Sequence, residues 1–328
     1  MKRFARIIGT GMYAPDKVMT NADFIPLLGE AVDEFVGGTL NIHERRICAE
    51  DESTADLCQA AAQNALQAAG LSPEALDLII IGTDTPEYLS PATASKVQHM
   101  LGAKNAGTFD VNCACAAFVT GLDIGAKYIV TDKMYTNVLV VGAYAMSKYL
   151  DFHDLYTATI FADGAGAVIL QAADEPGYLA SELHANGKFH DYMGIYAGGT
   201  QYPISPERIK AGEHQVRFTK KFPDDVNFEN WPRLTSIIME KAGRDISEID
   251  FIIFTQININ TIHDVMKELD LPLEKTHWIM DRYGYTGSAC IPMVLDEAVR
   301  SDKIKKGDLV VLVGSGGGYA MGAIAFEW

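Results

Sequence analysis

Apolar runs and amphipathic segments alternate along most of the chain. Residues 76–82, 137–142 and 167–170 are continuous apolar runs, as expected for strands that are buried on both faces. Residues 53–69 and 92–101 instead carry apolar side chains at helical spacing. This alternation of strands and helices predicts an α/β fold with largely parallel sheets.

The chain also matches itself, because four separate segments recur 173 residues further on. The segments are Ala69–Gly70, Leu76–Ile80, Leu122–Asp123 and Val138–Val140, which match Ala242–Gly243, Ile249–Ile253, Leu295–Asp296 and Val311–Val313. Chance rarely preserves register over four segments, so we expect two copies of one α/β unit. The predicted halves are residues 1–171 and 172–328. The region of about 172–231 interrupts the alternation of strands and helices. It is expected to form an inserted loop or lid region beside a substrate entrance.

One cysteine lies at a junction that is typical of a presented nucleophile. A predicted strand at 107–111 leads into small residues around Cys115, and a helix is expected from about Ala116. The first-turn N–H groups have no partners inside a helix, and the positive end of the helix dipole favours a thiolate. Flanking alanines leave room for a reactant to approach the sulfur. The alternative is a small cysteine that is simply buried in the core.

The composition is that of a globular protein. The 328 residues are 48% hydrophobic, which suits one large domain or two ordinary ones. No apolar run reaches the roughly 18 residues of a membrane span, and the N-terminus lacks the apolar segment of a signal peptide. We therefore expect a cytoplasmic protein. The five cysteines follow neither a disulfide framework nor a zinc spacing, so free thiols and no bound metal are expected.

The net charge of −16 argues against nucleic acid or an anionic membrane as a partner. One basic island interrupts the acidic chain. It consists of Arg208, Lys210, Arg217, Lys220 and Lys221. This island could receive a phosphate or an acidic carrier protein, or it could be a solvated helix face.

Five motifs resemble, in order and spacing, the landmarks of β-ketoacyl-acyl-carrier-protein synthase III, a family of the thiolase superfamily. They lie at residues 110–118, 161–167, 281–287, 295–298 and 314–318. The resemblance implies a duplicated αβαβα fold, in which two mixed five-stranded sheets sandwich helices. It also implies a homodimer, an acyl-CoA or acyl-carrier-protein thioester as substrate with no other cofactor, and Cys115 as the residue that becomes acylated.

Two positions depart from the Cys-His-Asn triad of that family. Thr255 stands where the family has His, and Tyr285 stands where it has Asn. Both side chains carry hydroxyl donors and could partly replace the lost hydrogen bonds to a thioester carbonyl. Neither is a good general base near neutral pH.

The resemblance also implies binding positions. The Cys115 N–H and the glycine loop Gly316-Gly317-Gly318 are candidates for an oxyanion hole, with a tight turn as the alternative reading of the glycines. The remaining candidates are Phe35 and Thr39 at the adenine end of CoA, Ser90 at the acyl pocket, Asn258 of the motif that holds Thr255, and Arg217 of the basic island. Thr39 replaces a family Arg, which favours a carrier protein or another CoA pose. Ser90 replaces a large residue and would open the acyl channel.

The leading hypothesis is an acyltransferase that loads an acyl group onto Cys115 and passes it to an acceptor. The second step would be condensation with a malonyl or β-keto nucleophile, or transfer to an alcohol or amine. The alternative is a non-catalytic partner subunit of an active paralogue. A thiolase or hydroxymethylglutaryl-type synthase fits less well, because no second catalytic Cys or Glu is recognisable and Cys290 is expected inside a helix.

Overall fold

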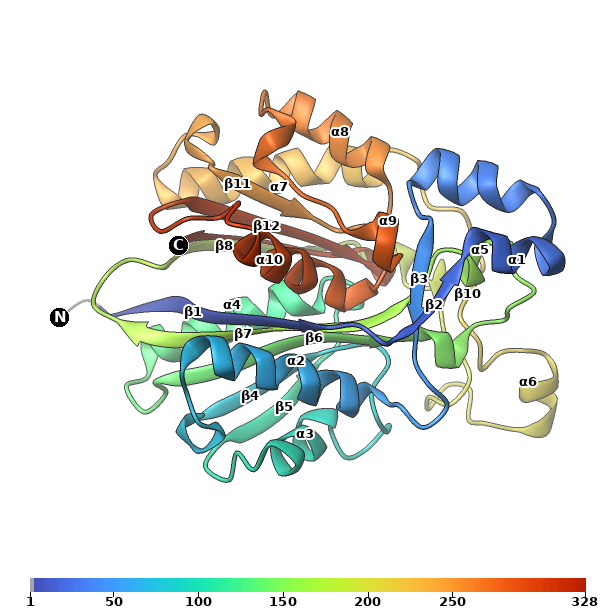
Figure 1. Ribbon diagram of the computed structural model, residues 1–328, viewed down its shortest axis with the longest axis horizontal. Helices are drawn as coiled ribbons and strands as arrows, with labels where there is room; N and C mark the ends of the chain where they lie inside the picture. Colours follow the sequence, from blue (N-terminus) through green and yellow to red (C-terminus); the bar gives the residue numbers. More distant parts are fainter. Residues whose placement is uncertain (1–2) are drawn as a thin grey trace.

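The computed structural model describes residues 3–328 and contains two main β-sheets with helices between and outside them (Figure 1). The first sheet has the order β1 (Phe4–Tyr13), β7 (Asp163–Ala173), β6 (Asn137–Ala145), β4 (Leu78–Gly82) and β5 (Gly107–Val111). The second has the order β11 (Phe251–Phe254), β12 (Leu309–Gly316), β13 (Ala320–Glu327) and β8 (Tyr178–Ala185). Both sheets are mixed, since each contains parallel and antiparallel pairs. The predicted thiolase-like α/β class is confirmed.

Two helices, α4 (Ala117–Thr131) and α10 (Cys290–Arg300), lie between the sheets. On the outer face of the first sheet lie α2 (Thr54–Ala69) and α3 (Thr93–Leu101), and on that of the second lies α7 (Val226–Ala242) with α8 (Ile259–Glu268) packed on it. The stretch 114–131 is long and apolar enough to cross a membrane, but 67% of it is buried. Its apolar surface is therefore that of a core helix contacted by both sheets.

The duplication expected from the sequence is present in the secondary structure. Strand β4 begins at Leu78 and β11 at Phe251, while α4 begins at Ala117 and α10 at Cys290, so both pairs are 173 residues apart. Helices α2 and α7 both end on a left-handed glycine, Gly70 and Gly243, with φ of 66° and 68°. Glycine adopts this conformation without the Cβ penalty, which explains why the Ala-Gly pair recurs.

Buried carboxylates tie each central helix to a strand of the other half. In α4, Asp123 accepts hydrogen bonds from Ser181 Oγ at 2.5 Å and Tyr178 Oη at 3.3 Å, both in β8. In α10, the equivalent Asp296 accepts one from Thr10 Oγ1 of β1 at 2.8 Å. A buried charge needs such partners, so the two halves complete each other's hydrogen bonding.

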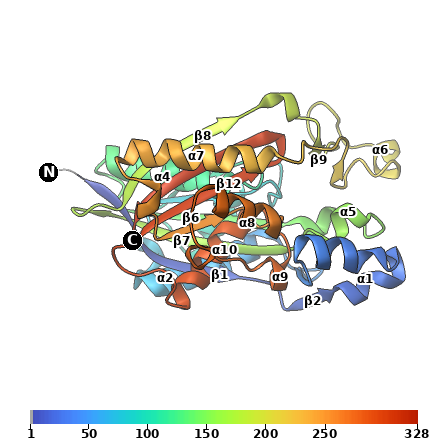
Figure 2. The ribbon, with the colours of Figure 1, turned by 90° about the horizontal axis from the view of Figure 1, so that it is seen from above.

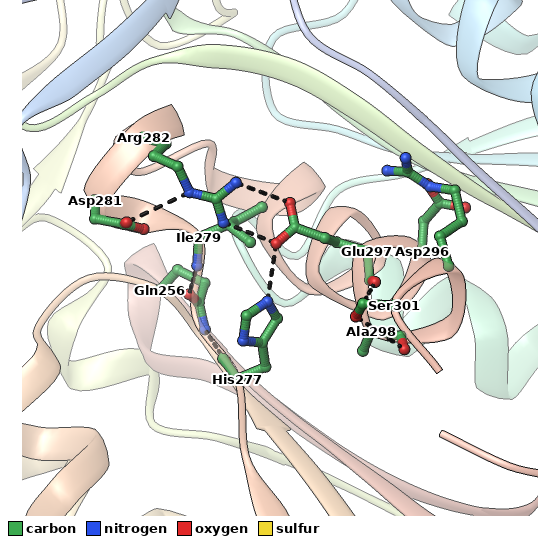
Figure 3. Close-up of polar contacts among 10 residues, drawn as sticks. Gln256, His277, Ile279, Asp281, Arg282, Asp296, Glu297, Ala298 and Ser301 are labelled. Carbon is green, nitrogen blue, oxygen red and sulfur yellow. Dashed lines mark hydrogen bonds and ion pairs between the residues drawn. The ribbon is translucent and has the colours of Figure 1, made fainter. Parts of the chain in front are cut away.

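The second sheet has four strands, not the expected five. The segment that follows α8 makes one isolated bridge, Ile252 to Thr276, before the short helix α9 (Met280–Tyr283). A side chain takes the place of the missing ladder: Gln256 donates to the His277 carbonyl at 3.4 Å and accepts from the Ile279 N–H at 3.0 Å (Figure 3). These backbone groups are thereby satisfied without a strand.

The predicted loop region 172–231 is only partly a loop. Strand β8 lies inside it and forms one edge of the second sheet, and α7 begins at Val226. As an edge strand β8 keeps polar residues on its exposed face, so its sequence lacks a continuous apolar run. The rest holds β9 (Met193–Gly194), α6 (Pro206–Lys210) and β10 (Arg217–Phe218).

These inserted elements lie at the end of the molecule opposite the N-terminus (Figure 2). The same end carries β2 (Lys17–Thr20), α1 (Asn21–Leu28), the π-helix η1 (Asp33–Leu40), β3 (Glu44–Ile47) and α5 (Leu155–Ala158). The parallel strands β4 and β5 of the first sheet run toward this end, where ligand sites of α/β sheets are usually found.

Candidate active site

Cys115 lies in the turn between β5 and α4, as predicted. The turn is sharp: Ala114 adopts a left-handed φ of 47°, and its N–H donates to Asn112 Oδ1 at 3.1 Å. The left-handed region is sterically unfavourable for alanine, and a residue in this conformation persists where the surrounding structure holds it there. The cysteine is 4% exposed and directly precedes the first residues of α4. The turn therefore holds the sulfur in a defined place at the helix start.

A cavity of about 160 Å³ borders Cys115. Its walls are mostly apolar and come largely from the second half and the inserted region. From the inserted region they include Met193, Phe218, Phe222, Val226 and Asn227, and from the second half Thr255, Ile257, Tyr285, Ser315, Gly316, Gly317, Tyr319 and Met321. The cavity therefore brings together five predicted site residues, and the inserted region lines it as expected.

The protonation of Cys115 differs from the thiolate expected from its helix position. Burial holds the pKa of the thiol well above its ordinary value, and the charge of Asp84 raises it further. A hydrogen bond from the Tyr285 hydroxyl acts in the opposite direction and lowers the pKa. Desolvation therefore outweighs the helix end, and the resting group is a thiol.

The Tyr285 hydroxyl contacts the Cys115 sulfur directly. It is 3% exposed, lines the cavity, and has its own pKa raised by burial and by Cys115. A tyrosine that donates to sulfur stabilises the thiolate once it forms. Tyr285 thus contacts the sulfur of Cys115.

Thr255 also lines the cavity, but its hydroxyl is engaged with the sheet. The Oγ1 atom accepts from the Ser315 N–H at 2.9 Å and lies 3.4 Å from the Ser315 carbonyl. The Thr255 hydroxyl oxygen therefore accepts a hydrogen bond from the Ser315 N–H. Its own proton makes only a long contact with the Ser315 carbonyl and can rotate toward another acceptor. Thr255, which directly follows β11, therefore joins that strand to β12.

The glycine loop approaches the nucleophile closely at Gly316. A Cβ there would lie 2.7 Å from the Cys115 amide nitrogen and 2.7 Å from the Cys113 carbonyl oxygen. Gly317 has room, with its nearest neighbours at 3.7 Å, whereas Gly318 has a left-handed φ of 71° and does not line the cavity. The left-handed Gly318 fits a tight turn, and Gly316 brings the loop against the Cys115 amide.

Three other predicted binding residues gather at η1 and the start of α8. Phe35 packs edge-to-face on exposed Tyr156 at 5.4 Å, and the Thr39 carbonyl accepts from Asn260 at 2.9 Å. The Asn258 side chain caps α8 by accepting from the Asn260 N–H at 2.9 Å. These groups lie outside the wall of the cavity around Cys115.

Ser90 and the basic island also lie away from the sulfur. Ser90 is exposed in the loop after β4. Arg217 adjoins Phe218 of the cavity wall and donates to the Ala211 carbonyl at 3.4 Å. Carboxylates neutralise three of the five basic side chains. The pairs are Arg208 with Glu213, Lys220 with Asp191, and Lys221 with Asp224. This pairing leaves a smaller positive surface than the sequence indicated.

The sequence interpretation missed a buried polar group near Cys115. Asp84 follows the end of β4, Tyr144 is the next-to-last residue of β6, and the charge of Asp84 raises the pKa of Cys115. A polar residue directly after an apolar strand was the available signal, because strand ends are where functional side chains gather. Within residues 3–328, no three His, Cys, Asp or Glu side chains form a group that could hold a metal ion.

The duplicated two-sheet architecture, with a cysteine at the start of the first inner helix, defines a thiolase-like protein. A family model described as "3-Oxoacyl-[acyl-carrier-protein (ACP)] synthase III" matches residues 109–187, and the model of its C-terminal part matches residues 239–328. The chain belongs to this synthase III family.

Relatives match along the whole chain. A β-ketoacyl-[acyl-carrier-protein] synthase III of Clostridioides difficile (strain 630) is 38% identical over 328 residues, which cover 100% of this chain and 99% of the relative. One of Xanthomonas campestris is 37% identical over 99% of this chain and 98% of the relative. The crystal structure of 3-oxoacyl-[acyl-carrier-protein] synthase III from Aquifex aeolicus VF5 superposes with a TM-score of 0.88 at 33% identity, and the match covers 99% of this chain and 100% of that chain.

Proposed function

We propose that this protein is an acyltransferase that forms an acyl-enzyme on Cys115. The donor is an acyl-CoA or an acyl-carrier-protein thioester, and the names of the relatives mention the acyl-carrier protein. The observation that carries the proposal is the position of the sulfur, at a helix start, in a strained turn and on the wall of a mostly apolar cavity. Small apolar cavities of this kind suit an acyl or pantetheine chain.

The acylation step exchanges one thioester for another, so it needs no further reactant. The Cys115 sulfur attacks the thioester carbonyl, the carbon–sulfur bond of the donor breaks, and the leaving thiol carries away the proton. Negative charge on the carbonyl oxygen would be stabilised by the Cys115 N–H and the backbone of the glycine loop, which Gly316 brings against it. Tyr285 would stabilise the sulfur while it is anionic.

The acyl group then passes to an acceptor. In a condensation, a malonyl or β-keto nucleophile attacks the acyl carbon and its enolate needs hydrogen-bond donors, for which Thr255 and Tyr285 are candidates. In an ester or amide transfer, an alcohol or amine attacks instead. Because both hydroxyls already have protein partners, their donation to substrate requires them to turn. Analysis of the product formed from acyl-enzyme with malonyl thioesters, alcohols and amines separates the two reactions.

Intact-mass measurement tests the first step. The protein is incubated with a series of acyl-CoAs and acyl-carrier-protein thioesters, and we expect the mass of one acyl group to be added. Cys115→Ala should abolish the adduct. Cys113→Ala removes a neighbouring free thiol that is more exposed, and should leave the adduct unchanged. No adduct on the wild type, or an equal adduct on Cys115→Ala, refutes the proposal.

A non-catalytic partner subunit is the second candidate. It is favoured by the engaged hydroxyl of Thr255 and by the raised pKa of Cys115. This role predicts co-purification with an active paralogue and no acylation of the wild type by any donor.

We also propose that the protein forms a homodimer. Strand β5 is an edge of the first sheet, and the nearby loop exposes Leu89 at 84% and Tyr88 at 50%. An open edge beside exposed apolar side chains is a surface that proteins normally cover. Light scattering should give twice the mass of the chain, and Leu89→Asp should shift it toward the monomer.

A further inference from the structure

A fully buried arginine of β3 has no anionic partner. Arg45 is 0% exposed and forms an ion pair with none of the carboxylates in residues 3–328. Its guanidinium lies 5.1 Å from the centre of the Phe24 ring, and its Nη2 atom is buried without a hydrogen bond. Burial lowers the pKa of Arg45 to about 10, against the charges of Asp23 and Asp33, and leaves the side chain charged near neutral pH. A buried charge without a counter-ion is costly, so its presence requires an explanation.

The other two guanidinium nitrogens of Arg45 join two separate segments. Nε donates to the Thr159 carbonyl at 2.7 Å, and Nη1 donates to Asn21 Oδ1 at 2.6 Å. Asn21 is the first residue of α1, and its side-chain nitrogen donates to the Ile42 carbonyl at 3.1 Å. A planar guanidinium presents its donors at fixed angles. Arg45 therefore fixes Thr159, which lies between α5 and β7, relative to the start of α1.

The residues after Thr159 hold Tyr285. The Tyr285 N–H donates to the Ile160 carbonyl at 2.9 Å, and the Tyr285 carbonyl accepts from the Ala162 N–H at 3.0 Å. These two bonds form a backbone bridge centred on Phe161, whose ring lies 5.7 Å from that of Tyr285. The position of Tyr285 is therefore tied to that of the segment which Arg45 binds.

Arg45 also packs against the turn that precedes Tyr285. Gly284 has a left-handed φ of 66°, and a Cβ there would lie 3.0 Å from Arg45 Cγ and 2.9 Å from Ala162 Cβ. Glycine is needed at this position both for its conformation and for the close approach of these side chains. The arginine thus contacts both segments of the bridge, at the Thr159 carbonyl on one side and at Gly284 on the other.

The bridge determines where the Tyr285 hydroxyl lies. Tyr285 is buried, lines the cavity together with Cys115, and makes a hydrogen bond with its sulfur. Burial and then the charge of Asp84 raise the pKa of the Cys115 thiol, and this hydrogen bond lowers it. Hydrogen bonds weaken steeply with distance and angle. A displacement of the Tyr285 backbone would therefore weaken the support of the sulfur.

We propose that Arg45 is a positioning residue for the acylation of Cys115. It fixes both segments of the bridge that carries Tyr285 and so keeps the tyrosine hydroxyl on the sulfur. The inference rests on the proposed acyl-enzyme. Arg45 takes no part in bond making, because it does not line the cavity. An apolar side chain of similar length could not donate to Thr159 and Asn21, which explains why a buried cation stands here.

The test follows the reactivity of Cys115 in a Cys113→Ala background, which removes the neighbouring thiol. Alkylation by iodoacetamide is measured over a range of pH, and acyl-enzyme formation with the best donor is measured beside it. Tyr285→Phe should slow alkylation by about 10–100-fold below the pKa of the thiol, because it removes a hydrogen bond to the charged form. Arg45→Met should move the alkylation profile to higher pH as well, by up to the same factor.

A double-mutant cycle separates positioning from general damage. In a Tyr285→Phe background, Arg45→Met should change alkylation and acylation by less than about 2-fold, because the hydroxyl that it positions is gone. Thr10→Val is the control for a general loss of stability. It removes the buried 2.8 Å hydrogen bond between β1 and α10 and should keep the wild-type alkylation profile.

Two further variants cover the case in which Arg45→Met does not fold, as judged by circular dichroism. Arg45→Lys keeps the cation but cannot reach both acceptors, so it should slow alkylation by a smaller factor. Gly284→Ala disturbs the bridge from the other segment, since its Cβ would meet Arg45 and Ala162. It should slow alkylation too, and should lose this effect in the Tyr285→Phe background.

The contrary outcomes can be told apart. An unchanged alkylation profile in the folded Arg45 and Gly284 variants, or in Tyr285→Phe itself, overturns the positioning role. Equal slowing with and without the Tyr285 hydroxyl also overturns it, because Arg45 then acts by another route. A wild type that is alkylated at Cys115 but acylated by no donor refutes the proposed function, and the alkylation data still decide the role of Arg45.

Discussion

Single residues decide how closely the protein backbone approaches the nucleophile. Gly316 and Gly317 are neighbours in one loop, yet a Cβ at the first would meet the Cys115 nitrogen at 2.7 Å and a Cβ at the second finds nothing nearer than 3.7 Å. The atoms in the way of Gly316 belong to the backbone and cannot rotate aside. Only the first position therefore requires glycine for space.

This contrast gives a paired prediction. Gly316→Ala should force the loop away from Cys115, slow acylation by about 10²–10³-fold and lower the free energy of unfolding by about 1–3 kcal/mol. Gly317→Ala should change stability by less than about 1 kcal/mol and retain acylation. Urea unfolding and the acyl-enzyme assay measure both. Equal effects of the two substitutions would contradict the assigned close approach.

The sequence indicated the position of Cys115 at a helix start but not the protonation of its sulfur. Cys115 was recognisable because strand, small residues and helix are local features. Its pKa depends on Asp84 and Tyr285, which are distant in the chain, and on burial by both sheets. A helix end alone favours the thiolate, and only the assembled neighbours show that desolvation prevails.

At the scale of elements, an ion network joins α9 to α10. Glu297 contacts His277 Nε2 at 2.9 Å and accepts two bonds from Arg282, at 2.7 and 3.2 Å (Figure 3). The hydrogen bond from His277, followed by that from Arg282, lowers the pKa of Glu297 to about 2. The network lies beside Gln256, which holds the segment that replaces a fifth strand.

This network predicts acid sensitivity with a defined sign. Because the pKa of folded Glu297 lies below its ordinary value of 4.5, its stabilising effect is full above pH 4.5 and is lost as pH falls through about 2. Glu297→Gln should therefore destabilise the protein near neutral pH and lose less stability than the wild type on acidification. Urea midpoints from pH 7 to about 3 measure this. The exposed Glu268→Gln on α8 is the control, and equal pH slopes for wild type and Glu297→Gln would contradict the assignment.

Elements were predictable where their burial was uniform. Strands β4 and β6, buried on both faces, and helices α2 and α3 were evident from their patterns. Strand β8 was missed because an edge strand carries polar residues on one face. The missing fifth strand could not be foreseen, since its absence depends on which backbone groups one side chain, Gln256, satisfies.

At the scale of the molecule, the two halves should unfold together. All three tryptophans, Trp231, Trp278 and Trp328, lie in the second half, so fluorescence reports on that half alone. Thr10 lies in the first half and donates to Asp296 of α10. Thr10→Val should lower the unfolding midpoint seen by fluorescence, at a cost of about 1–3 kcal/mol.

The same experiment includes its own check. Circular dichroism, which reports on both halves, should give the same midpoint as fluorescence. Thr131→Val, an exposed hydroxyl at the end of α4, should move neither probe by more than about 0.5 kcal/mol. A Thr10→Val protein with an unchanged fluorescence midpoint would show that the halves melt independently.

The exchange of hydroxyls between the halves has a consequence for the origin of the chain. Asp123 is satisfied by β8 and Asp296 by β1, so the same contact is made twice, once in each direction. That reciprocity is the signature of a two-fold symmetric interface between identical subunits. Each carboxylate pairs with a cation of its own helix, Lys127 or Arg300, so an ancestor with one copy of the unit would have needed a second identical chain only for the hydroxyl that completes the hydrogen bonding. Fusion of two such genes would then have freed one cysteine position to become Ser288, whose hydroxyl now binds the Ala143 carbonyl at 2.6 Å.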